Sequence, residues 1–118
     1  MIRLKEEHEV ILKDSPFNGE GKIQVCNLIN KPEELLNCGR VFAHTTVYPG
    51  SSIGYHVHIR ESELYYILKG KARFNDNGTM REIRAGDVTI TYPGEGHGIT
   101  TIGEEPVEMI ALILQVNK

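Results

Sequence analysis

Turn signals recur along the chain at short intervals and leave room only for short extended segments between them. Pro49-Gly50, Lys69-Gly70, Asn77-Gly78, Gly86-Asp87 and Pro93-Gly94 each contain residues that favour tight turns. The segments between them are rich in β-branched and aromatic residues, which suit the pleated surface of a sheet. Short strands separated by frequent turns are typical of a β-sandwich or a β-barrel. We therefore expect an all-β fold with little helix.

These turns bound the expected strands. They cover residues 10–12, 23–29, 41–48, 63–68, 71–74, 79–83, 88–92 and 107–116. Asn77-Gly78 predicts a hairpin between two of them, because both residues tolerate positive φ. The last segment is apolar at most positions, which predicts a strand that is buried centrally or covered by a subunit contact. One short helical turn is expected near residues 32–37, with Pro32 near its start and Gly39 just past its end.

Length and charge restrict the class of protein. The 118 residues fit one domain, and 40% of them are hydrophobic. A net charge of −3 provides no basic surface for nucleic acid or an anionic membrane. The most apolar stretch, residues 109–114, is too short to span a bilayer, and no secretory leader follows Met1. We expect a cytoplasmic protein that binds neither nucleic acid nor membrane, with Cys26 and Cys38 as free thiols.

Histidines at alternate positions are the most informative chemical feature. His56 and His58 would point to the same face of a strand, about 6 to 7 Å apart, and could converge on one metal ion. Glu63 follows five residues after His58, so a bend must intervene before it can face the same site, and residues 60–62 are polar enough to supply one. His97 lies at another junction between a turn and a strand, far along the chain.

The spacing of these residues resembles the first motif of the cupin family. That motif reads G-x5-H-x-H-x3or4-E-x6-G, and Gly50, His56, His58, Glu63 and Gly70 match every fixed position over residues 50–70.

The second cupin motif, G-x5-P-x-G-x2-H-x3-N, is matched more loosely over residues 86–101. Gly86 and His97 keep the family's separation of eleven residues, and Gly94 keeps the internal glycine. Pro93 falls one position late, and Thr101 stands where the family has asparagine. The resemblance implies one cupin domain over residues 1–118, with a jelly-roll β-barrel or sandwich.

The resemblance also implies a metal site made of His56, His58, Glu63 and His97, holding one divalent ion of Mn, Fe, Ni, Co, Cu or Zn. Three neutral imidazoles and one carboxylate would leave such an ion with a net charge near +1. In six-coordinate geometry two positions would stay open, which is typical of a catalytic site rather than a structural one.

Other polar residues have simpler interpretations. His8 and His44 are expected to pack or face solvent, although His44 could line the pocket and act on a substrate. Tyr65 shares a strand face with Glu63 and could donate a hydrogen bond to a substrate, so Tyr65 and His44 are the candidate catalytic residues. Glu61 is an alternative carboxylate ligand, but its spacing better fits a solvated or salt-bridged role. The arginines at 60, 73, 81 and 84 are scattered and are expected to be solvated.

Three functions remain open from the sequence. The first is a metal enzyme acting on a small polar substrate as a dioxygenase, decarboxylase or isomerase. The second is a binding module that holds a small ligand through the metal without changing it, and the third is a structural relic, against which the intact ligand set argues. A homodimer is also expected, because cupins commonly pair and because residues 23–29 and 107–116 carry surplus apolar surface.

Overall fold

The structure is a computed structural model that describes residues 1–116, and it is built almost entirely of strands. In chain order the strands are β1 (Glu9–Asp14), β2 (Lys22–Asn27), β3 (Gly39–Val47), β4 (Ser52–Val57), β5 (Glu61–Lys69), β6 (Lys71–Asp76), β7 (Thr79–Arg84), β8 (Val88–Thr91), β9 (Gly96–Ile102) and β10 (Val107–Gln115). Three 3₁₀ turns accompany them: η1 (Lys5–Glu7), η2 (Pro16–Asn18) and η3 (Pro32–Leu35). No helix in this part of the chain is long and apolar enough to cross a membrane.

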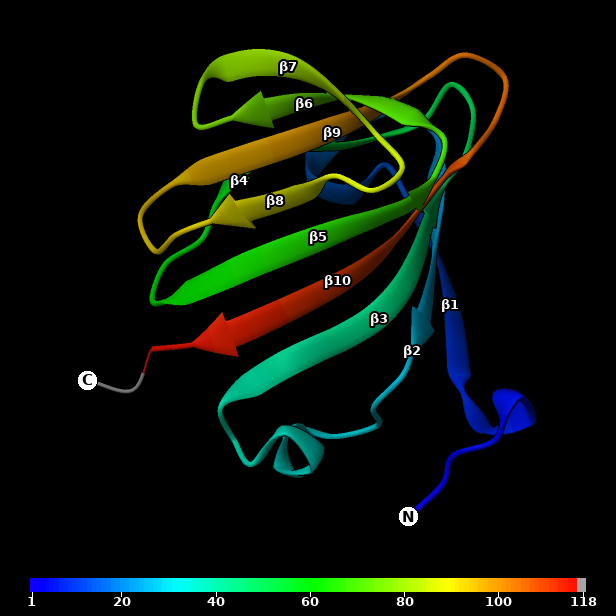
Figure 1. Cartoon of the computed structure of the whole chain (residues 1–118), viewed down its shortest axis with the longest axis vertical. Helices are drawn as coiled ribbons and strands as arrows, with labels where there is room; N and C mark the ends of the chain where they lie inside the picture. The colour runs from blue at the N-terminus through cyan, green and yellow to red at the C-terminus, as the bar shows by residue number, and fades with distance from the viewer. Residues whose placement is uncertain (117–118) are drawn as a thin grey trace.

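The strands form two antiparallel sheets, as Figure 1 shows. One sheet has the order β1-β2-β3-β10-β5-β8 and the other has the order β4-β9-β6-β7. The expected jelly-roll sandwich is therefore confirmed. Over residues 1–116 the two sheets do not close on each other, so the expectation of a barrel is corrected to an open sandwich.

The eight expected ranges agree with strands of the structure apart from their ends, whereas β4 and β9 had no expected range. β10 lies between β3 and β5, which confirms the prediction of a central strand. β6 and β7 pair directly across Asn77 and Gly78, whose φ angles are 49° and 100°, so the predicted hairpin is also confirmed. β5 begins at Glu61, two residues earlier than expected, and β2 ends at Asn27, two residues earlier than expected. The helical turn is present as η3, a single 3₁₀ turn.

Alternation along β5 divides the protein into an interior and an outer face. Glu63, Tyr65 and Ile67 are buried between the sheets, whereas Tyr66 and Leu68 are exposed on the other side. The interior is filled by apolar side chains from both sheets. Those with the least exposure are Ala43, Val47, Ile67, Ala72, Ile99, Val107 and Met109.

Two glycines and one threonine at motif positions have structural roles. Gly70 has a φ of +87°, and a Cβ there would lie 2.5 Å from the carbonyl oxygen of Pro106, so only glycine fits the turn from β5 to β6. Gly50 has a φ of +74° in the turn before β4. Thr101 replaces the family's asparagine, yet its hydroxyl donates a buried hydrogen bond of 2.8 Å to the carbonyl of Val47. Thr101 of β9 thus still connects its sheet to β3 of the other sheet.

Candidate metal centre

Four side chains that can bind a metal converge inside the sandwich. His56 comes from β4, His58 from the residue after that strand, Glu63 from β5 and His97 from β9. One potential ligand atom from each lies within 4.8 Å of the others. His56 and His97 stand directly opposite each other on paired strands, so the sheet itself fixes their relative position. The four residues that the motifs indicated are therefore together, and they could hold a metal ion.

The bend that the sequence required between His58 and Glu63 is centred on Arg60. Arg60 has a φ of +61°, in the left-handed region, and this reverses the chain between β4 and β5. Backbone hydrogen bonds hold both sides of the bend. The amide of His58 donates to the carbonyl of Glu95, and the amide of Val116 donates to the carbonyl of Arg60.

The spacing of the donor atoms fits adjacent ligands of one metal ion. Glu63 Oε1 lies 3.0 Å from the Nε2 atoms of both His58 and His97, and these two nitrogens are 3.1 Å apart. Ligands at right angles on a metal with bonds of about 2.1 Å are about 3.0 Å apart. The three atoms are therefore already separated as a six-coordinate ion would need them.

Hydrogen bonds to the other ring nitrogen favour the protonation state that metal binding requires. His56 Nδ1 is 2.7 Å from the carbonyl of Gly54, an acceptor, so this nitrogen carries the proton. His58 Nδ1 is 3.1 Å from Glu61 Oε1, again an acceptor. His97 Nδ1 lies 2.8 Å from the hydroxyl of Thr91. Protons on Nδ1 would leave the Nε2 lone pairs free once a metal binds, an arrangement found at many metal-binding histidines.

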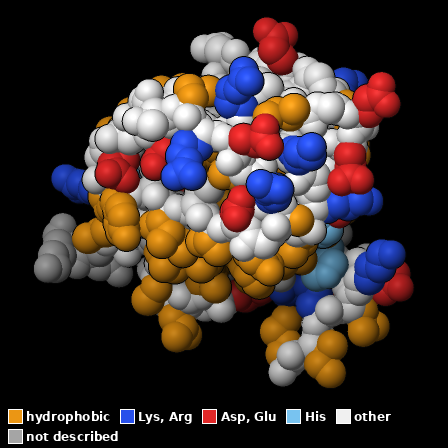
Figure 2. All heavy atoms as spheres, turned by 45° about the horizontal axis from the view of Figure 1, so that its top comes forward, with side chains coloured by type: hydrophobic (Ala, Val, Ile, Leu, Met, Phe, Trp, Pro, Cys, Tyr) orange, Lys and Arg blue, Asp and Glu red, His pale blue; other side chains and the backbone are white. Residues whose placement is uncertain are grey.

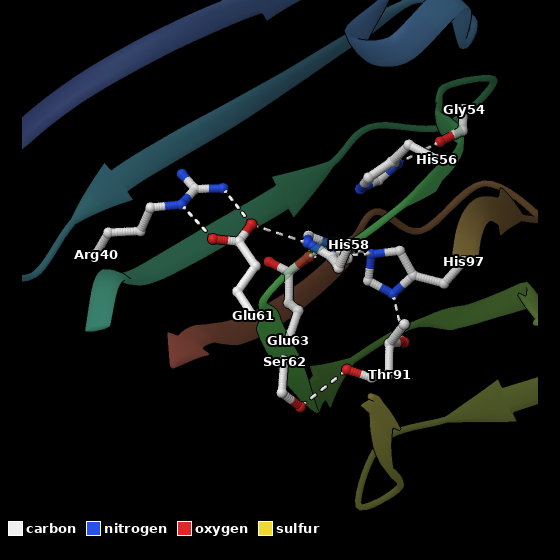
Figure 3. A network of polar contacts seen from close by, with 9 residues as sticks. All are labelled: Arg40, Gly54, His56, His58, Glu61, Ser62, Glu63, Thr91 and His97. Carbon is white, nitrogen blue, oxygen red and sulfur yellow. Dashed lines mark hydrogen bonds and ion pairs between the residues drawn. The ribbon is translucent and has the colours of Figure 1, made fainter. Parts of the chain in front are cut away.

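Figure 3 shows a second ionic pair behind His58. The guanidinium of Arg40 donates from Nε and Nη2 to the two oxygens of Glu61, at 2.8 and 2.7 Å. Glu61 in turn accepts from His58 Nδ1. The expected salt-bridged role of Glu61 therefore matches its position, and its carboxylate orients His58 from behind while Glu63 faces the Nε2 side.

The charges of the site reflect these contacts. Burial would raise the pKa of Glu63, but its hydrogen bonds to His58 and His97 outweigh burial and lower the pKa to about 2. The Glu63 carboxylate also raises the pKa of His58, whereas burial lowers the pKa of His56. Of His56 and His58, His58 therefore carries a proton more readily. A buried carboxylate facing imidazole nitrogens needs a cation, and a divalent metal can replace that proton.

A cavity of about 380 Å³ opens onto three of these four side chains, His56, His58 and Glu63. Tyr65 also lines it and stacks on the His97 ring, with ring centroids 5.0 Å apart. Burial and the Glu63 charge raise the pKa of Tyr65 well above 10, so its hydroxyl remains a neutral donor. Phe17 of η2 stacks on His56, with ring centroids 3.7 Å apart, and forms part of the cavity wall.

His44 does not lie in the site. It sits on the outer face of β3, where its Nε2 is 3.0 Å from Glu108 Oε1, and it does not line the cavity. The alternation of β3 sends Ala43 and Thr45 inward and His44 outward, so the proposal of His44 as a catalytic residue is corrected.

Several residues around the site were not anticipated from the sequence. Arg40, rather than any of the four arginines named above, is the arginine that reaches the cavity. Thr91 pairs with Glu63 across β5 and β8, which places its hydroxyl beside His97. Neither residue belongs to a motif. The pairing register of the strands would have identified Thr91, but no local pattern indicates Arg40 or Phe17.

The Arg40–Glu61 pair leads to a prediction about metal affinity. Glu61→Gln removes the charge that accepts the His58 proton, and we expect it to weaken binding of a divalent transition metal roughly 10- to 100-fold. The measurement is a competition titration with a chelator. Glu34→Gln is the matched control, because Glu34 is bonded to Arg3 at 2.6 and 3.0 Å outside the site. An unchanged affinity in Glu61→Gln would show that Glu61 does not orient His58.

Comparison with known proteins gives the same picture of the fold. The chain is 43% identical over 96 residues to an oxalate-binding protein of Thermotoga maritima, covering 81% of this chain and 78% of that protein. The crystal structure of a predicted oxalate decarboxylase from Thermotoga maritima superposes with a TM-score of 0.92 at 36% identity, covering 98% of this chain and all of the other. A cupin-like protein of the same organism shares the fold at 20% identity and a TM-score of 0.70, with 82% and 71% of the two chains covered.

The family model described as the cupin domain matches residues 43–113, which include all four converging side chains. This range also contains residues 107–113 of the central strand β10 and residues 43–47 of β3. The match covers more than half of the chain, and the sequence motifs, the sandwich and the relatives agree with it. The chain therefore belongs to the cupin family.

Proposed function

We propose that His56, His58, Glu63 and His97 bind one divalent transition metal, and that the protein is a metal-dependent enzyme acting on a small carboxylate. The observation that carries this proposal is the convergence of the Nε2 atoms of His58 and His97 with the Glu63 carboxylate at separations of 3.0 to 3.1 Å. The metal is Mn, Fe, Ni, Co, Cu or Zn, because mixed nitrogen and oxygen ligands suit these ions better than Mg or Ca. When bound, the ion supplies Lewis acidity, and a redox-active one also supplies electron transfer.

Residues around the cavity would orient the substrate. The hydroxyl of Tyr65 stays protonated, so it can donate a hydrogen bond to a carboxylate oxygen. Lys13 lines the same cavity and offers a positive charge, whereas the charge of Arg40 is already engaged by Glu61. Buried apolar walls would keep water away from the reacting groups.

Oxalate is the first compound to test, because the relative from Thermotoga maritima carries the name oxalate-binding protein. Binding without turnover is the second candidate. It is favoured by the lining of the cavity: besides the proposed ligands, its ionisable side chains are Lys13, Arg40 and Tyr65, and none of these is a carboxylate or a histidine that could serve as a general base.

The test is incubation of the metal-loaded protein with oxalate, with each of the six metals in turn. We expect oxalate to bind and to be converted, for example by decarboxylation of hydrogen oxalate to formate and carbon dioxide, which chromatography detects. His58→Ala should abolish both metal content and conversion, because it removes a ligand with only 5% exposure. His44→Ala is the control and should retain both. Oxalate recovered unchanged from a stable complex would favour the binding module, and no carboxylate binding with any metal would contradict both.

We also propose a homodimer, formed through the outer face of the six-stranded sheet. Across β3, β10, β5 and β8 this face carries two apolar rows, in which Ile110, Tyr66 and Val88 are neighbours in one row. The other row contains Phe42, Leu112, Leu64 and Ile90. Figure 2 shows hydrophobic side chains gathered in the lower half of the view, next to a region where charged side chains predominate.

The location of this surface differs in part from the expectation. The apolar surplus lies on β10, β5 and β8, whereas Ile23 of β2 is buried in the core and Val25 packs against it. Four strands about 4.8 Å apart, with up to nine residues of about 3.3 Å each, give a face of about 15 by 30 Å. Two identical faces of this size would cover about 900 Å² in flat projection, near the lower limit of specific protein interfaces.

The dimer is tested by sedimentation equilibrium. Tyr66→Lys places a charge in the middle of the apolar face, and we expect it to convert a dimer into a monomer. Tyr55→Lys is the matched control, because both tyrosines are 48% exposed and Tyr55 lies on β4 of the other sheet. A wild-type monomer, or a Tyr66→Lys dimer, would contradict this assignment.

We also propose a single domain and a cytoplasmic location for the protein. Residues 1–118 are taken as one cupin domain, which is supported by β1 and β2, since these strands precede the matched range and still pair into the same sheet as β3. The protein is placed in the cytoplasm, in keeping with the free thiols of Cys26 and Cys38.

A further inference from the structure

The cavity beside the proposed metal centre is large for oxalate. Its volume is about 380 Å³. A water molecule occupies about 30 Å³ in the liquid, so the cavity has room for about a dozen groups of that size. Oxalate has only four oxygens and two carbons, and would leave roughly half of the space unfilled.

The walls of the cavity differ from the end that holds the metal-ligating side chains. Ile23, Val25, Ile53, Met109, Ala111 and Ile113 all line it, and they come from both sheets. An apolar wall of this kind holds water poorly and gains free energy when an apolar group covers it. The polar residues of the lining are His56, His58, Glu63 and Tyr65 at the proposed metal centre, and Lys13, Asn27, Arg40 and Thr45 elsewhere. Tyr65 and Lys13 can donate to a carboxylate, whereas Arg40 is engaged by Glu61.

We infer that the preferred substrate is a carboxylate with an apolar chain of several carbons, rather than oxalate itself. This inference rests on the proposed metal function. The carboxylate, with a neighbouring oxygen, would meet the metal at the polar end, and the chain would lie along the walls formed by β2, β3 and β10. Each methylene that enters the cavity should then strengthen binding.

Ala111 offers a direct way to test this arrangement. It lies on β10 directly opposite Tyr65 of β5, it is 4% exposed, and its small side chain leaves part of the cavity open. Ala111→Leu would fill that space without removing a proposed metal ligand. Val25→Phe would fill it from β2, and provides a second variant if Ala111→Leu does not fold. Ile110→Leu is the control, because Ile110 is the neighbouring residue on the outer side of the same strand.

The experiment measures binding of straight-chain 2-oxo acids to the metal-loaded protein by calorimetry. The probes are pyruvate, 2-oxobutanoate, 2-oxopentanoate and 2-oxohexanoate, which share one metal-chelating head, with oxalate as the reference. We expect affinity to rise with each added methylene, by up to about fourfold per step. In Ala111→Leu and Val25→Phe this rise should disappear for the longer acids while pyruvate binding is retained. Ile110→Leu should keep the wild-type series.

Three outcomes would overturn the inference, and metal analysis before each titration separates a failure of the proposed metal function from a failure of the inference. If the wild type contains metal and binds pyruvate and 2-oxohexanoate equally, the cavity walls do not select the chain, and the proposed metal function still stands. If the wild type takes up no metal, the proposed metal function is wrong, and the inference that rests on it is wrong as well. A rise with chain length that persists in both filled variants would also contradict the assignment to this cavity.

Discussion

The convergence of three imidazole rings on one buried carboxylate is the constraint on which the rest of the site depends. Glu63 and His97 are almost completely removed from solvent, so the negative charge of Glu63 must be balanced inside the protein. His58 and His97 face it with their Nε2 atoms, while their Nδ1 atoms contact Glu61 and the hydroxyl of Thr91 on the other side of each ring. A cation at the centre satisfies this arrangement, and a divalent metal does so with four protein ligands.

The two sheets supply the positions that this centre requires. Pairing of β4 with β9 sets His56 opposite His97, and the left-handed bend at Arg60 turns the chain so that Glu63 faces them. Behind the centre, the pair formed by Arg40 and Glu61 holds the ring of His58 from the side of β3. Alternation along β5 and β10 then separates two surfaces: an inner one that lines the cavity, and an outer apolar one that is free to contact another molecule.

Much of the fold followed from local sequence, and much of the site followed from spacing. Turn residues bounded eight of the ten strands to within about two residues, because glycine and proline act on the backbone directly, but no range was predicted for β4 or β9. The two motifs identified His56, His58, Glu63 and His97 because the spacing of these residues reflects strand pairing. Arg40 and Phe17 could not be predicted, since each acts through contacts between residues distant in sequence. His44 was assigned to the wrong face because the phase of β3 relative to the core is not evident from the polar and apolar pattern of residues 41–48.

The measurement that tests the account most directly is the metal content of the protein, purified without added metal and then equilibrated with divalent transition metals. We expect close to one equivalent of a single ion per chain, and its loss in His97→Ala, because His97 is a fully buried ligand from the strand paired with β4. Retention of one equivalent in His97→Ala, or no uptake by the wild type, would contradict the proposal that these four side chains form a metal centre.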